Sequence, residues 1–187
     1  MPEFNIVPTN NPLFEESYTP AQLITHLKST LGEEYGQLSI LEDEVLGKGS
    51  DCIVFRDRGP SLRVVKVTQN IVQAHCARRI TGDPDQFKGL VNCFGVTRVC
   101  GDLFVIKERL LCPINDDIQQ QIAWWLDDVF DARISDSVKH DLAAIEVSCR
   151  LLGLVDWDTD LLNNVMWGPW CGWSRLVLHD FGHGTLV

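Results

Sequence analysis

The spacing of apolar residues changes along the chain, and near the N-terminus it has the period of a helix. One helical face would carry four apolar residues, Leu23, Ile24, Leu27 and Leu31. Thr19 and Pro20 are typical of a helix start, because a threonine side chain can cap the first turn and proline suits the first helical position. Gly32 is typical of a helix end. The pattern predicts a helix between these signals, preceded by an irregular arm in residues 1–18.

From Gln37 onward the apolar residues lie in short, β-branched segments that are typical of strands. Strands are predicted in residues 37–46, 52–57, 62–68, 91–99 and 103–111. A helix is predicted between the third and fourth strands, in residues 69–80, where the turn signal Gly82-Asp83-Pro84 ends it. A tight turn at Gly101-Asp102 would join the last two strands.

The second half of the chain is predominantly helical in its pattern. Two helices are predicted in residues 114–133 and 135–153, the second with Ser135 as its N-cap and Gly153 as its stop. Two short apolar strands follow, in residues 164–167 and 175–180. This order predicts an α+β protein with its sheet before its helical part. The predicted divisions are an arm and helix in residues 1–36, a sheet lobe in residues 37–112 and a minimal helical lobe in residues 113–187.

Composition and charge narrow the class of protein. The 187 residues suit one domain, with 45% apolar and 22% charged residues. The net charge of -10 disfavours nucleic acid as a partner, because an acidic surface repels phosphate backbones. No secretory signal and no apolar run of about 20 residues is present, so no membrane association is expected. The seven dispersed cysteines lack zinc spacing and indicate free thiols in a reducing, cytoplasmic compartment.

The segment from Gly47 to Val54, here called the glycine loop, connects the first two predicted strands. Gly47 and Gly49 would let the backbone approach a phosphate closely, Ser50 lies at the tip, and Val54 would cap an adenine ring. The alternative is an ordinary hairpin turn, since Cys52 stands where a third glycine would complete a nucleotide-binding pattern.

Lys66 lies twelve residues after Val54 in the predicted strand RVVKV. A lysine that faces the core is costly unless its ammonium meets an anion, and nucleotide phosphates would supply one. The alternative is a lysine on the solvent face of the strand.

Two polar segments of the second half are candidates for metal and acceptor chemistry. The first carries Asp156, Asp158, Asp160, Asn163 and Asn164 between apolar flanks. Such a density of carboxylates and amides is explained by a metal or substrate, or alternatively by a polar loop with capping side chains. In the second, Asp180 ends an apolar strand and precedes Phe181-Gly182, which makes it a hard-oxygen ligand at a strand terminus.

In this order, the glycine loop, Lys66, the Asp/Asn segment and the Asp-Phe-Gly triplet resemble the protein-kinase-like superfamily. The layout is most similar to small phage-encoded or bacterial-effector serine/threonine kinases. The resemblance implies a two-lobe fold that binds ATP and Mg²⁺, with residues 108–111 meeting the adenine. The nucleotide would contact Gly47, Gly49, Ser50, Val54, Lys66, Glu108 and Leu110. It also implies Asp158 or Asp160 as the residue that orients the acceptor hydroxyl, and Asn163 or Asn164 together with Asp180 as metal ligands.

The sequence departs from the kinase pattern at three points. The predicted helix after Lys66 offers no glutamate, and Gln73 is the plausible polar partner of Lys66 on that helix, with Asp83 or Asp85 as the alternative. Asp158 and Asn163 keep the spacing of the aspartate and asparagine in a kinase catalytic loop. Asn164-Val165-Met166, however, is the better match to the residues that usually form the end of that loop. Only five residues follow Gly182, which leaves no activation segment and a truncated helical lobe. We therefore expect either a minimal serine/threonine kinase that modifies a partner or host protein, or a pseudokinase-like module that regulates a protein partner without transfer. A small-molecule phosphotransferase is a weaker alternative.

Overall fold

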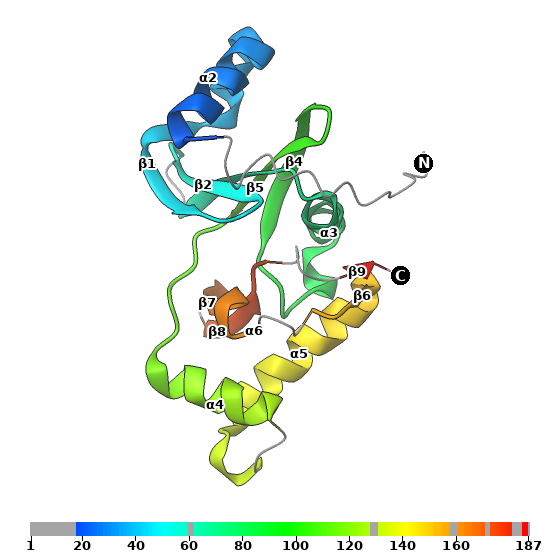
Figure 1. The fold of residues 1–187 in the computed structure, drawn as a ribbon. Helices are drawn as coiled ribbons and strands as arrows, with labels where there is room; N and C mark the ends of the chain where they lie inside the picture. The colour runs from blue at the N-terminus through cyan, green and yellow to red at the C-terminus, as the bar shows by residue number, and fades with distance from the viewer. Residues whose placement is uncertain are drawn as a thin grey trace.

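The computed structural model describes residues 18–59, 62–127, 131–157, 161–170, 173–180 and 185–186 (Figure 1). Three predicted features lie outside these residues: most of the N-terminal arm, the segment that holds Asp158 and Asp160, and Phe181-Gly182.

The first described helix, α2 (Pro20–Leu31), confirms the helix predicted from the N-terminal pattern. Its start is a reciprocal capping box, in which the Thr19 side chain accepts from the Gln22 backbone N–H and the Gln22 side chain accepts from the Thr19 backbone N–H. Gly32, with a positive φ of 54°, ends it. A 3-10 helix, η1 (Gly32–Leu38), then covers the start of the segment predicted as the first strand, which begins only at Ile40.

Five antiparallel strands form one sheet, as the sequence predicts. They are β1 (Ile40–Lys48), β2 (Cys52–Asp57), β3 (Arg63–Thr68), β4 (Cys93–Cys100) and β5 (Leu103–Arg109). Their order in the sheet is β1-β2-β3-β5-β4, so β3 and β5 are central neighbours. The chain reaches β4 through helix α3 (Ile71–Gly82), which Asn70 caps, and a short 3-10 helix η2 (Pro84–Gln86).

The two faces of this sheet pack against different parts of the chain. The outer face carries Val65 and Val67 and packs on Leu23 and Leu27 of α2. The inner face carries Lys66 and Ile106, and Ile106 belongs to a larger core that includes α3 and the second half of the chain. The side chains predicted to carry chemistry on β3 therefore face the interior between the sheet and the remainder of the molecule.

The second half contains the two predicted helices, although the first of them is shorter than expected. Helix α4 (Asp116–Leu126) covers only part of the predicted 114–133 segment, and a 3-10 helix η3 (Asp131–Arg133) lies at its far end. Helix α5 (Asp136–Leu152) confirms the second, with Gly153 in the left-handed conformation at its end.

The last elements form two small antiparallel pairs. One joins β7 (Val165–Trp170) to β8 (Trp173–Leu178), which confirms the predicted strand pair. The other, β6 (Leu154–Val155) with β9 (Thr185–Leu186), is not predicted by the sequence pattern. The end of the predicted polar loop, Leu161–Asn164, is the short helix α6.

The segment between η2 and β4 holds β8 in place beneath the sheet. The Leu178 backbone N–H donates to the Gly89 carbonyl at 3.0 Å, and the Val91 N–H donates to the Leu178 carbonyl at 2.9 Å. On the opposite side, the buried carboxylate of Asp141 on α5 accepts from the Leu176 N–H at 3.0 Å. These bonds fix β8, which ends two residues before Asp180.

Candidate functional site

The glycine loop forms a tight turn, and Gly47 lies at a register shift between β1 and β2. The Gly49 backbone N–H donates to the Cys52 carbonyl at 2.9 Å, and Gly47 pairs with Val54 across the hairpin. A Cβ atom on Gly47 would meet nothing within 4 Å, and one on Gly49 would meet only the Cys52 sulfur at 3.4 Å. Neither glycine has a positive φ. Neither a positive φ nor close packing therefore explains the two glycines.

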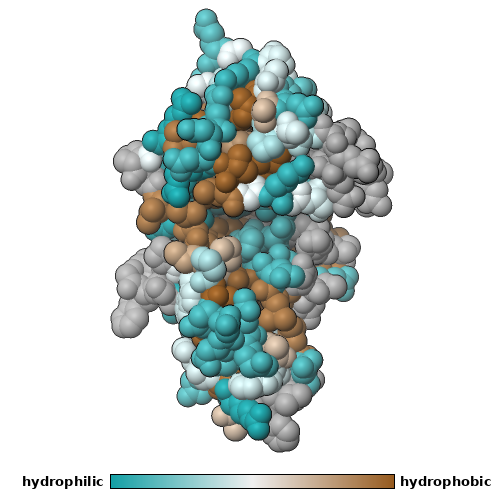
Figure 2. All heavy atoms as spheres, turned by 60° about the vertical axis from the view of Figure 1, so that its left-hand side comes forward, coloured by the Kyte–Doolittle hydropathy of each residue, from teal (hydrophilic) through white to brown (hydrophobic). Residues whose placement is uncertain are grey.

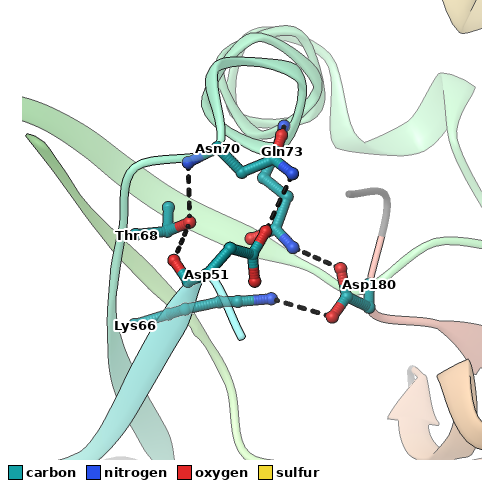
Figure 3. A network of polar contacts seen from close by, with 6 residues as sticks. All are labelled: Asp51, Lys66, Thr68, Asn70, Gln73 and Asp180. Carbon is teal, nitrogen blue, oxygen red and sulfur yellow. Dashed lines mark hydrogen bonds and ion pairs between the residues drawn. The ribbon is translucent and has the colours of Figure 1, made fainter. Parts of the chain in front are cut away.

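Asp51 at the tip of the glycine loop is bonded to the start of α3 (Figure 3). Its carboxylate accepts from the Asn70 side-chain amide at 2.8 Å, and its backbone carbonyl accepts from the Thr68 hydroxyl at 2.9 Å. The Asn70 side chain also caps α3 by accepting from the backbone N–H groups of Val72 and Gln73. Neither Asp51 nor Asn70 is among the site residues predicted from the sequence.

Lys66 is buried on the inner face, with 3% of its surface exposed, which excludes the alternative of a solvent-facing lysine. Its neighbours across the sheet are Val54 on β2 and Ile106 on β5. The Lys66 Nζ lies 3.7 Å from the Oδ2 of Asp180, so the central strand and the segment after β8 meet at an ion pair (Figure 3). Two residues far apart in the sequence are thus brought together.

Gln73 contacts Asp180 and not Lys66. Its side-chain Nε2 donates to Asp180 Oδ1, while its own Oε1 is buried without a hydrogen-bond partner among the described residues. The expectation that this helix supplies a partner for Lys66 is therefore corrected: α3 reaches the site through the Asp180 carboxylate. Asp180 is held from two sides, by an ammonium and by an amide (Figure 3).

Glu108 is a second buried carboxyl group on the inner face, with 6% of its surface exposed. Val64 pairs with Glu108 and Lys66 with Ile106, so Glu108 is the diagonal neighbour of Lys66 on the same face. Burial raises the pKa of Glu108 to about 7, a shift that the Lys66 ammonium opposes and Asp180 reinforces. For Lys66, burial lowers the pKa, but Glu108 and Asp180 outweigh burial and raise the pKa above its ordinary value.

Because the pKa of Glu108 is elevated, the difference in stability between the wild type and Glu108→Gln should depend on pH. Because the folded-state pKa lies above the usual 4.5, folding loses stability as pH rises from 4.5 through about 7. We expect Glu108→Gln to match the wild type near pH 4.5 and to exceed it by about 3 kcal/mol in unfolding free energy at pH 8. Urea unfolding at several pH values measures this difference.

Glu44→Gln is the matched control, because Glu44 is an exposed carboxylate of the same sheet that pairs with Arg56. It should follow the wild-type pH dependence throughout. Equal stability of Glu108→Gln and the wild type at pH 8 would contradict the assigned environment of Glu108.

His179 immediately precedes Asp180, and its backbone is bonded to Asn164. The His179 backbone N–H donates to the Asn164 carbonyl at 3.0 Å. Burial, aided by Lys66, lowers the pKa of the His179 imidazole to about 4, so this ring is neutral at physiological pH. Asn164 is buried and its side-chain Nδ2 has no partner among the described residues, whereas Asn163 is exposed. Of the two predicted asparagines, Asn164 has the amide whose hydrogen bonding is incomplete.

The backbone after β5 leaves one donor free. The N–H groups of Arg109, Leu110 and Cys112 donate to the carbonyls of Asn92, Leu62 and Trp167, respectively. Leu110, predicted to contact a nucleotide, thus has its N–H occupied by Leu62. In this stretch of described residues, Leu111 alone has an N–H without a protein acceptor. Leu111 is therefore the residue of this stretch whose backbone can donate to a ligand, and the sequence alone does not distinguish it from Leu110.

Apolar side chains are exposed near this segment. Val45 and Leu46 on β1 are 40% and 42% exposed, and Leu62 is 58% exposed. Figure 2, which brings the β1 side of Figure 1 forward, shows hydrophobic atoms both above and below the middle of this face. Leu46 directly precedes the glycine loop and was not selected from the sequence.

Two kinds of feature, a membrane-spanning helix and a cluster of metal-binding side chains, are absent from the described part of the chain. No helix there is long and apolar enough to cross a membrane. No group of three or more histidine, cysteine, aspartate or glutamate side chains is arranged there to hold a metal.

Comparison with known proteins gives one kind of match. No protein-family model matches the chain, and no curated protein matches it. Among solved structures, it matches a crystal structure of a kinase domain with 15% sequence identity and a TM-score of 0.46. The match covers 76% of this chain and 50% of the kinase domain. The chain therefore spans about half the length of that domain.

Proposed function

We propose that this chain binds ATP with Mg²⁺ and transfers the γ-phosphate to a serine or threonine hydroxyl of a partner or host protein. The observation that carries the proposal is the ion pair of the buried Lys66 with the half-buried Asp180 at 3.7 Å, close to a glycine-containing hairpin with room for a Cβ at both glycines. Buried charges of this kind are retained where they bind or react.

The charges of the pair are complementary to a metal-bound nucleotide. Lys66 and Asp180 neutralise each other here, and Glu108, with a pKa of about 7, adds a partial negative charge at neutral pH. A nucleotide phosphate offers an anion to Lys66, while its metal offers a cation to Asp180. Both partners of the ion pair are then replaced in one binding event, and the partial negative charge is offset.

The residues around Asp180 suit a magnesium ion. Asp180 is a hard-oxygen ligand, and Asn164 has a buried amide with an unpartnered end that can turn its oxygen toward a cation. Mg²⁺ at this position would neutralise charge on the transferring phosphate. Gln73 holds the Asp180 carboxylate, and the neutral His179 adds no competing positive charge.

The remaining groups would position the nucleotide and the acceptor. Lys66 binds the α- and β-phosphates, and the Gly47 and Gly49 backbone allows their close approach. Val54 and Leu46 flank the base, and the free Leu111 N–H donates to its edge. Asp158 or Asp160, outside the described residues, would orient the acceptor hydroxyl from the segment that Leu161 anchors in the core.

One observation favours a second function, a nucleotide-binding module that regulates a partner without transferring phosphate. Gln73 of α3 is bonded to Asp180, and α3 supplies no carboxylate to Lys66. A lysine that lacks a dedicated carboxylate from this helix is less firmly oriented toward the phosphates.

Lys66→Ala is the direct test of the nucleotide site. We expect the wild type to show a rise in melting temperature with ATP and Mg²⁺ and transfer of labelled phosphate to itself or to a generic protein. The variant should lose both, because the phosphates lose their buried counter-charge. Absence of both signals in the wild type would refute the proposal, and a thermal shift without transfer would favour the binding module. Transfer by Lys66→Ala would refute the site assignment.

A further inference from the structure

Two arginines lie directly opposite each other on the outer face of the sheet, away from the proposed nucleotide site. Arg63 of β3 pairs with Arg109 of β5, at the end of the ladder nearest the second half of the chain. Both share a face with Val65, because alternate residues of a strand point to the same side. Like charges at directly opposite positions destabilise a sheet unless an anion lies between them.

No described carboxylate lies within ion-pair distance of either arginine, although the buried Asp57 lies on the neighbouring strand β2. The printed sequence has 26 acidic and 16 basic residues, yet neither arginine forms an ion pair with a described acidic side chain. By contrast, Arg56 pairs with Glu44 at 2.6 Å and Arg98 with Asp102 at 3.6 Å. Lys107, next to Arg109 on the same face, donates only to the Gln37 carbonyl, so a third cation adds to the local positive charge.

The donors of these guanidinium groups are incompletely satisfied. Arg63 and Arg109 are both half-buried, and the Nε of each is buried without a hydrogen-bond partner among the described residues. A buried donor that lacks an acceptor is costly, and rotation of the guanidinium presents its Nε edge to a ligand. The Nε edge is one of the two-pronged donor edges with which arginine binds oxyanions.

Phe94 orients one of the two arginines. The register of β4 with β5 shifts between Cys93 and Gly95, so Phe94 is the extra residue of a β-bulge. The Arg63 guanidinium carbon lies 4.1 Å from the centre of the Phe94 ring. Stacking on a ring leaves the edges of a guanidinium available for hydrogen bonds in its plane.

We propose that Arg63 and Arg109 form a phosphate-binding site on the outer face of the sheet, with Phe94 as its platform and Lys107 as a flanking charge. The ligand is a phosphate group, either inorganic phosphate or the phosphate of a phosphorylated side chain. Its negative charge converts the repulsion between the two arginines into attraction for a shared partner.

NMR titration of the whole chain tests this site, with inorganic phosphate, a phosphoserine peptide and the same peptide without phosphate as probes. We expect saturable shifts of the Phe94, Gly95 and Arg109 amide signals with the phosphate-bearing probes alone. Arg63→Gln and Arg109→Gln should each weaken binding by about tenfold or more, because each removes charge-assisted hydrogen bonds. Tighter binding of the phosphopeptide would identify a phosphorylated protein as the source, and equal binding would identify free phosphate.

Two controls make the test specific. Arg56→Gln removes an arginine of the same sheet that already has a carboxylate partner, and it should bind as the wild type does. Lys66→Ala should also retain these shifts, which separates this site from the nucleotide site. Arg109→Gln should keep or raise the melting temperature without phosphate, since it removes a like-charge contact. Absence of saturable shifts in the wild type, or an equal loss in Arg56→Gln, would overturn the proposal.

Discussion

Asp180→Asn is expected to abolish the effect of Mg²⁺ on nucleotide binding and to reduce phosphate transfer by at least about a hundredfold, the usual loss when one charge-stabilising group is removed. Asparagine keeps the shape of the side chain and an oxygen that can accept from Gln73, whereas the negative charge is lost. Lys66 retains Glu108 as a nearby buried carboxyl group. The fold should therefore persist while the cation loses its charged ligand.

Thermal unfolding with ATP, with and without Mg²⁺, measures this effect separately from transfer. At a hundredfold excess over Kd, a ligand stabilises the folded state by about 2.7 kcal/mol, which corresponds to roughly 5–10 °C for a domain of this length. We expect this Mg²⁺-dependent increment in the wild type and not in Asp180→Asn. Lys66→Ala differs, since it should lose nucleotide binding under both conditions.

Asp57→Asn is the matched control for Asp180. Asp57 is a buried aspartate at the end of β2 whose carboxylate accepts from the Gly59 backbone N–H, outside the proposed site. It should keep the Mg²⁺-dependent increment and transfer at the wild-type level. If Asp180→Asn keeps the increment as well, Asp180 is not the metal ligand.

Gly89→Ala is expected to destabilise the protein more than any other glycine substitution among those the structure describes. A Cβ at this position would lie 2.6 Å from the Ala144 carbonyl carbon and closer still to the backbone of Ile145. These are backbone atoms of α5, so no side-chain rotation can relieve the overlap. Gly89 also accepts from Leu178, and the shift needed to admit a methyl group would displace β8.

Overlap of this kind costs about 3 kcal/mol or more, equivalent to a fall of roughly 6–12 °C in melting temperature. Circular dichroism on heating measures it. Gly36→Ala is the control, because a Cβ there meets nothing within 4 Å and its φ is not positive. A wild-type melting temperature for Gly89→Ala would show that α5 does not approach this segment as described.

The sequence predicted the elements of this fold better than the contacts within its site. The ends of α2 and α5 are determined by local signals, the capping box at Thr19 and the left-handed Gly153, which operate over a few residues. The five strands follow from β-branched segments between turns. In contrast, β6 and β9 are two residues each, too short to show a period.

The site required knowledge of strand register and of partners distant in the sequence. Glu108 was predicted to meet the adenine, which stays a prediction; only the register shows that its side chain shares the inner face with Lys66. The Gln73 contact depends on where β8 ends relative to α3, which no local pattern encodes. Lys66 and Asp180 could be selected because a lysine between valines and an aspartate after an apolar run are chemically conspicuous in any register, and their roles stay a prediction.

The hydrogen bond between Asp51 and Asn70 connects the glycine loop to the first turn of α3. Asn70 caps the turn that carries Gln73, and Gln73 holds Asp180. Lifting the loop to admit a ligand therefore pulls on the same turn that holds the Asp180 carboxylate. If the proposed nucleotide enters beneath the loop, this chain of hydrogen bonds would couple its entry to the position of that carboxylate, through side chains that touch neither phosphate nor metal.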